Sequence, residues 1–110
     1  MISVKGNNIM MTRGDTETLI VTIRDVNGNP YTLSEDEYVE FCAKLRPTDK
    51  EPLIHKVSSD GSFTFERSDT WGMRPGKYEY NIRVENGTNT YHTIIEGHLN
   101  ITAVVDDASD

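Results

Sequence analysis

A strict alternation of apolar and polar residues runs from Lys77 to Glu85, and it is the feature that most restricts the fold. The sequence there reads KYEYNIRVE, and its apolar members are Tyr78, Tyr80, Ile82 and Val84. Successive side chains of a β-strand point to opposite faces of a sheet, so this spacing is typical of a strand with one buried face. We therefore predict a half-buried antiparallel strand whose four apolar residues face the core.

A tight hairpin is predicted directly after this strand, at Asn86-Gly87, because both residues accept the positive φ of a type I′ turn. The return strand is predicted from Asn89 to Thr102. Its core-facing row is expected to be Tyr91, Thr93, Ile95, Gly97, Leu99 and Ile101. Because so long a strand exceeds the usual length, Gly97 is expected to mark a bulge or a bend.

Five further segments carry the same alternation and are predicted as strands. They are Ile9–Met11, Thr18–Arg24, Val39–Arg46, Leu53–Val57 and Ser62–Glu66. The middle segment has two clear rows. The row expected to face the core is Val39, Phe41, Ala43 and Leu45, and the opposite row is Glu40, Cys42, Lys44 and Arg46.

Turn signals separate the seven segments at intervals of roughly ten residues. This pattern is typical of an all-β, immunoglobulin-like antiparallel β-sandwich of about seven strands. A single helical turn is expected near Ser68–Gly72, with Ser68 or Asp69 as its N-cap. Since 110 residues are the size of one domain, we predict a single domain over residues 1–110, with its core at about 9–102 and an acidic tail at 103–110.

Charge and cysteine content exclude several classes of protein. The single cysteine, Cys42, excludes an internal disulfide. Eleven basic and eighteen acidic residues give a net charge of −7, which repels phosphate backbones, so no nucleic-acid partner is expected. The start of the chain lacks the apolar stretch of a signal peptide, and no segment is as long and apolar as a membrane helix. We therefore expect no membrane partner and synthesis in a reducing cytoplasm.

No metal ion or cofactor is expected from the spacing of the potential ligands. The histidines, His55, His92 and His98, match no zinc signature. The stretch from Asp25 to Asp36 begins like a calcium loop. It has proline at the sixth position and aspartate at the twelfth, where such loops need glycine and glutamate. The acidic run at 35–37 leaves a weak cation site open.

No catalytic residue is expected either. Cys42 lies in the middle of a predicted strand, where no helix N-terminus lowers its pKa, so we interpret it as a small strand residue. Arg13-Gly14-Asp15 is the tripeptide that integrins recognise, but the glycine and aspartate are better explained as a turn between two strands. Trp71 is expected to close one end of the sandwich. The aromatic residues left as surface candidates are Tyr31, Tyr38 and Tyr91.

A series of short stretches in a fixed order resembles small β-sandwich domains of phage and prophage structural proteins, including the N-terminal domain of upper baseplate proteins. The stretches are IMMTRGDT at Ile9–Thr16, DVNGNPYTL at Asp25–Leu33, SDTWGMRPGKYEYNIRV at Ser68–Val84 and EGHLNIT at Glu96–Thr102. The resemblance covers residues 9 to 102. Such domains often head a longer fibre chain, whereas this one stops at Asp110, so a stand-alone adaptor and a fragment both stay open.

The resemblance implies a non-enzymatic structural or adaptor component of the virion, made in the host bacterium, that docks onto other virion or baseplate proteins. Self-association is included among these contacts. The alternative is an immunoglobulin-like adhesion or carbohydrate-binding module of a bacterial surface protein. The candidate docking surface is the outward row of the strand from Asn89 to Thr102, with His92, Ile94 and His98, together with Ile20 on the outward row of an earlier strand.

Overall fold

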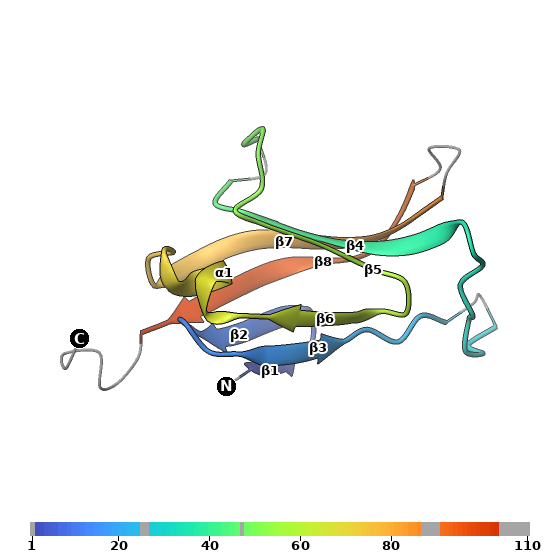
Figure 1. The fold of residues 1–110 in the computed structure, drawn as a ribbon, viewed down its shortest axis with the longest axis horizontal. Coiled ribbons are helices and arrows are strands. Elements are labelled where there is room, and N and C mark those ends of the chain that lie inside the picture. Colours follow the sequence, from blue (N-terminus) through green and yellow to red (C-terminus); the bar gives the residue numbers. More distant parts are fainter. Residues whose placement is uncertain (1, 25–26, 47, 87–90, 104–110) are drawn as a thin grey trace.

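The computed structural model describes residues 2–24, 27–46, 48–86 and 91–103, and for residues 3, 5 and 91–94 the backbone alone. Within these residues the chain forms eight strands and one short helix (Figure 1). They are β1 (Ile2–Lys5), β2 (Asn8–Thr12), β3 (Glu17–Ile20), β4 (Glu37–Lys44), β5 (Ile54–Ser58), β6 (Ser62–Phe65), α1 (Arg67–Trp71), β7 (Gly76–Asn86) and β8 (Tyr91–Thr102). The all-β class is confirmed, and each of the seven predicted strands is present.

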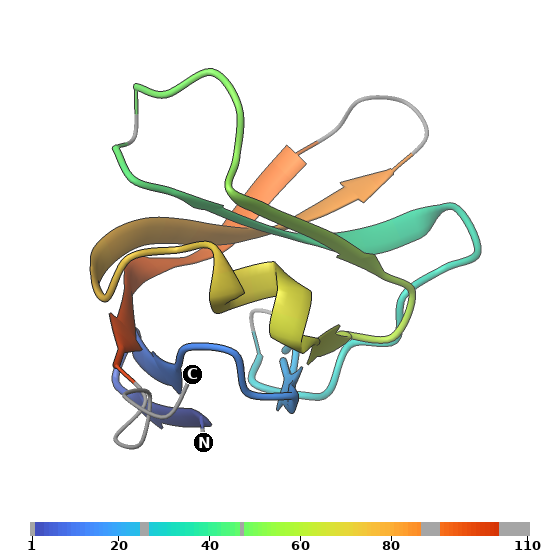
Figure 2. The same cartoon turned by 60° about the vertical axis from the view of Figure 1, so that its left-hand side comes forward.

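The strands form a six-stranded sheet in the order β1-β2-β8-β7-β4-β5 and a two-stranded sheet of β3 and β6. The larger sheet curls, so that β1 and β2 come round beneath β4 and β7 (Figure 2). All pairs are antiparallel except β2 with β8, which run parallel with Ile9 opposite Leu99. The purely antiparallel sandwich predicted from the sequence is therefore wrong at this pair, and the immunoglobulin-like assignment stays a prediction.

Strand β1 is the one strand of the described chain that the periodicity did not predict. It joins β2 in a tight hairpin whose last pair is Lys5 with Asn8. Gly6 makes the turn with a φ of 61°, a conformation that glycine adopts without steric cost. Four residues are too few to show a clear alternation, so the Gly-Asn turn is the signal that identifies this strand.

The core lies between the two sheets, and Phe41 is at its centre. Its ring stacks on Tyr80, with centroids 5.5 Å apart, and meets Phe65 edge-on at 5.3 Å. Tyr78, Tyr80, Ile82 and Val84 are all buried, which confirms the predicted inward row of β7. Leu45 was expected to continue the inward row of β4 but is exposed, because β4 ends at Lys44 and the chain then leaves the sheet.

The bulge in the long strand lies at a different residue from the one predicted. Ile82 pairs with Ile95 and Arg83 with Thr93, so the register between β7 and β8 shifts at Ile94. The pairing runs without a shift through Gly97. The predicted core-facing row of β8 is therefore in regular register with β7 only from Ile95 onward. The turn expected at Asn86-Gly87 falls partly outside the described residues.

Because Gly97 has no side chain, the β1–β2 turn can pack closely against the sheet at this position. A Cβ atom at this position would lie 2.0 Å from the carbonyl oxygen of Asn7. The same carbonyl accepts a hydrogen bond of 2.6 Å from the hydroxyl of Tyr80. The close contact holds the turn against the inner side of the curled sheet.

Helix α1 begins at Arg67 with Glu66 as its N-cap. The prediction of Ser68 or Asp69 as the N-cap is therefore wrong. Asp69 instead accepts a hydrogen bond of 2.7 Å from the backbone N–H of Glu66. In the part of the chain that the structure describes, no helix has the length and apolar character needed to cross a membrane.

Trp71, at the end of α1, is half-buried, and two guanidinium groups lie over its ring. Arg67 lies 3.7 Å and Arg13 4.4 Å from the ring centroid. Gly14 packs against the same ring and donates a hydrogen bond of 2.7 Å to the hydroxyl of Thr70. The Arg13–Asp15 tripeptide is thus a turn packed on the helix, as the turn interpretation predicted.

Candidate functional site

The outer face of the six-stranded sheet carries a cluster of polar side chains where β4 and β5 pair. Glu40 and Cys42 lie two residues apart on β4, so both side chains point outward, away from Phe41. His55 on β5 is the cross-strand partner of Cys42, and Arg83 on β7 is the partner of Glu40. The pairing of three strands therefore brings four chemically different side chains together.

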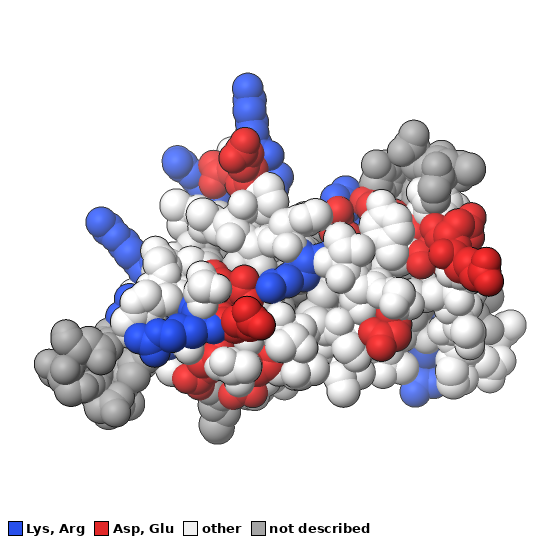
Figure 3. Space-filling model, in the orientation of Figure 1, with Lys and Arg blue, Asp and Glu red and all other residues white. Residues whose placement is uncertain are grey.

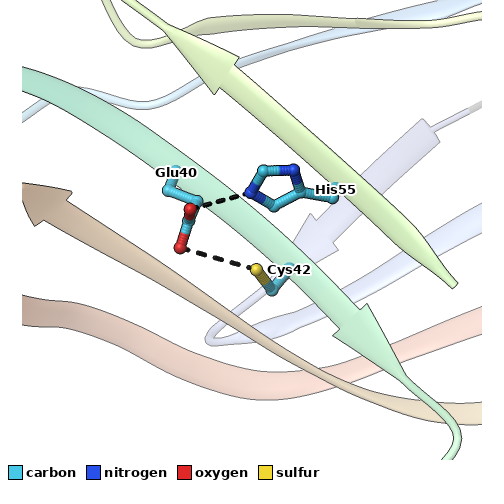
Figure 4. A group of neighbouring side chains, drawn as sticks. All are labelled: Glu40, Cys42 and His55. Atoms are coloured by element: carbon cyan, nitrogen blue, oxygen red, sulfur yellow. Dashed lines mark hydrogen bonds and ion pairs between the residues drawn. The ribbon is translucent and has the colours of Figure 1, made fainter. Parts of the chain in front are cut away.

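Glu40 is the centre of this cluster (Figure 4). Its Oε2 atom lies 2.7 Å from Nε2 of His55, and its Oε1 atom accepts a 3.6 Å hydrogen bond from the thiol of Cys42. The guanidinium of Arg83 also donates to Oε1. The Glu40 side chain is 12% exposed and that of His55 is 47% exposed, so the cluster is reached from solvent on its β5 side.

Arg83 interacts with two carboxylates in and beside the cluster. Burial of Glu40 opposes its ionisation, but hydrogen bonds from His55 and Arg83, together with the charge of the guanidinium, outweigh this and hold its pKa below the ordinary value. Arg83 also lies 3.6 Å from Oε1 of Glu85, which is buried. The two carboxylates thus share one guanidinium.

Cys42 is held in an environment that favours its thiol form. Burial raises the pKa of Cys42, and the neighbouring charge of Glu40 raises it further. The Nε2 atom of His55 hydrogen-bonds to Glu40, and the described contacts include no hydrogen bond from this imidazole to the sulfur, as a nucleophile–base pair would need. A nucleophilic cysteine needs the opposite shift, so these surroundings do not favour Cys42 as a nucleophile.

Glu40, Cys42 and His55 also form the one group of three or more potential metal ligands found among the described residues. Their ligand atoms all lie within 4.8 Å of one another. A shallow hollow of about 190 Å³ opens beside Cys42 and is lined in addition by Lys44, Glu79, Tyr80, Asn81, Glu96 and Gly97. The cluster therefore has open space next to the sulfur.

Apolar side chains flank His55 on both sides: Leu53 immediately precedes β5, and Val57 lies within it. Leu53 is 53% exposed and Val57 is 57% exposed. With His55 they form an outward row, which we call the β5 row and define as Leu53, His55 and Val57. Strand β5 is the last strand in the six-stranded sheet, paired on one side with β4. An apolar row on an edge strand is a feature that stable monomers usually avoid.

The two predicted docking residues whose side chains are described lie on different sheets. Ile20 lies on β3 in the smaller sheet and is 70% exposed. His98 lies on β8 in the larger sheet, with its Nε2 atom 3.2 Å from Glu79. The side chains of His92 and Ile94 lie outside the described residues. Strand β8 is between β2 and β7, so it is not an edge strand.

The other surface candidates are distributed over separate regions. Tyr31 is exposed, but its hydroxyl donates a 2.7 Å hydrogen bond to Glu37. Tyr38 is half-buried on β4, and the side chain of Tyr91 lies outside the described residues. Asp25, the first residue of the calcium-like stretch, also lies outside them. On the face seen in Figure 3, acidic and basic side chains lie in small mixed groups separated by uncharged surface.

Comparison with protein-family models gives no match, and comparison with curated proteins gives no significant match either. The phage setting therefore rests on the motif series alone.

Sequence reasoning placed Glu40 and Cys42 on one face but missed their convergence with His55 and Arg83. The spacing of His55 from Cys42 along the chain matches no metal or catalytic signature. The two residues come together only because β4 and β5 pair on either side of the loop that joins them. The signal that could have identified this proximity from the sequence is the alternation of β4 combined with a hairpin pairing of β4 to β5. That pairing sets His55 opposite Cys42.

Proposed function

We propose that this chain is a non-enzymatic docking domain of a phage or prophage particle and that it binds a neighbouring protein through the β5 row. The observation that carries the proposal is the combination of an edge strand with two apolar side chains, Val57 on the strand and Leu53 immediately before it, each more than half exposed. The motif series described above suggests the particle.

An edge strand supplies the two things that strand addition requires. Its backbone can pair with an extended segment of a partner, and alternate side chains then fit that segment. In the β5 row the apolar side chains of Leu53 and Val57 flank the polar one of His55. We infer that the partner contributes an extended segment with apolar residues at alternate positions.

The β5 row replaces the outward row of β8 as the docking surface. Strand β8 has ladders on both sides, to β2 and to β7, so its backbone cannot accept a further strand. Ile20 is more exposed than either apolar residue of the β5 row, but it stands on the other sheet.

A carbohydrate-binding module is the less favoured alternative because sugars stack on free aromatic faces. Guanidinium groups of Arg13 and Arg67 lie against the ring of Trp71. The hydroxyl of Tyr31 is engaged by Glu37.

Photo-crosslinking tests the proposal. A photoreactive amino acid is placed at position 57 in the β5 row, or at position 20 as the matched control on an exposed apolar site. Each version is expressed in the host bacterium while particles assemble. We expect position 57 to give a defined adduct with one structural protein of the particle, and Leu53→Lys to abolish it.

Adducts at position 20 and none at position 57 would contradict the docking surface. Adducts at position 57 with a protein that is not part of a particle would contradict the phage setting but not the surface. Sedimentation velocity over a concentration series shows whether the adduct partner is a second copy of this chain.

A further inference from the structure

The geometry points to a binding site for one thiophilic divalent cation of the zinc class, with Cys42, His55 and Glu40 as its protein ligands. This proposal replaces the sequence-based expectation that the chain holds no metal. It concerns the isolated domain and does not depend on docking by the β5 row.

The distances between the ligand atoms are close to those that a metal needs. Zinc lies about 2.0–2.3 Å from nitrogen, oxygen and sulfur ligands, so tetrahedral geometry separates these atoms by roughly 3.3–3.7 Å. The Oε2 atom of Glu40 lies 2.7 Å from Nε2 of His55, and the ligand atoms of Glu40, Cys42 and His55 all lie within 4.8 Å of one another. Small side-chain rotations therefore suffice to place the three around one ion.

The donor set selects the class of metal. A thiolate and an imidazole are the ligands preferred by zinc and related transition metals, whereas magnesium and calcium take oxygen ligands. Three protein ligands leave a fourth position for water or another molecule. The hollow lined by Cys42, Lys44 and Asn81 provides space beside the sulfur for that fourth ligand.

Arg83 and Glu85 surround the ligands in a way that suits a bound cation. Arg83 donates to Oε1 of Glu40, which leaves Oε2, the oxygen facing His55, for the metal. Glu85 lies 3.6 Å from the guanidinium and balances its charge. A carboxylate and a thiolate then balance the two charges of the metal. Such outer hydrogen bonds orient ligands in metal sites.

The three ligands stand on strands that differ in how many neighbours they have in the sheet. Glu40 and Cys42 stand on β4, which has partners on both sides, and His55 stands on the edge strand β5. A bound ion would therefore join the edge strand to its neighbour through side chains in addition to the backbone ladder. Binding releases the thiol proton of Cys42, because the thiolate is the ligand.

The test uses the full chain without a histidine tag, freed of metal and titrated with Co²⁺ and then with Zn²⁺. We expect one Co²⁺ per chain, with the absorption of a thiolate-to-cobalt charge transfer, and displacement of Co²⁺ by Zn²⁺. Cys42→Ser should abolish the charge-transfer band, and His55→Gln should weaken Zn²⁺ binding at least about tenfold. Zn²⁺ should also raise the melting temperature of the wild type.

His98→Gln is the matched control, because His98 also faces a glutamate, Glu79, on the outer side of the same sheet, where the described contacts include no cysteine. It should bind Zn²⁺ as the wild type does. Absence of a charge-transfer band in the wild type would overturn the proposal. An equal loss of affinity in His98→Gln and His55→Gln would do so too, since binding would then be unspecific. Circular dichroism of each variant separates a lost ligand from a lost fold.

Discussion

At the scale of single residues, burial decides which substitutions matter. Ile82 is 1% exposed in the inward row of β7, and Ile20 is 70% exposed on β3. We expect Ile82→Ala to lower the free energy of unfolding by about 2–4 kcal/mol, because it loses transfer energy and leaves a cavity. Ile20→Ala should change it by less than about 0.5 kcal/mol. Urea denaturation of both variants measures the difference, and equal effects would show that the inward row is wrong.

At the scale of elements, the turn between β5 and β6 depends on an ionised Asp60. Its carboxylate accepts hydrogen bonds from the backbone N–H of Ser62 and the hydroxyl of Ser58, both at 2.9 Å. These bonds lower the pKa of Asp60 from its ordinary value of 3.8. A group whose pKa is lowered by folding stabilises the protein above its unfolded pKa, and this contribution is lost as the pH falls through the folded value. We therefore expect Asp60→Asn to cost stability near neutral pH, and the gap from the wild type to close below about pH 4. Urea midpoints measured across that range would refute this explanation if the gap stayed constant.

At the scale of the whole molecule, the β1–β2 turn packs closely against Gly97 of β8. A methyl group there would meet the carbonyl oxygen of Asn7 at 2.0 Å, so the turn must move and its hydrogen bond from Tyr80 must stretch. We expect Gly97→Ala to cost about 1–3 kcal/mol, as overpacking does. Gly72→Ala is the matched control, because a Cβ at Gly72 meets no atom within 4 Å. Thermal melting of the two variants distinguishes them, and equal melting temperatures would contradict a role for this contact.

The amino-acid sequence alone determined where seven strands run and which side chains of β7 face the core. Alternation is a local property of the chain, and burying one face of a sheet enforces it, so it can be recognised without knowledge of any partner strand. The same property placed Glu40 and Cys42 together on the outer face of β4.

Only the tertiary structure decided which strands are neighbours. The parallel pairing of β2 with β8, the register shift at Ile94 and the contact of Gly97 with Asn7 all depend on packing between distant segments. The candidate site depends on the same packing, because His55 and Arg83 reach Glu40 from two other strands. Periodicity determines the face of each strand, but the register that brings side chains from different strands together is set by the loops and by the fit of the whole core.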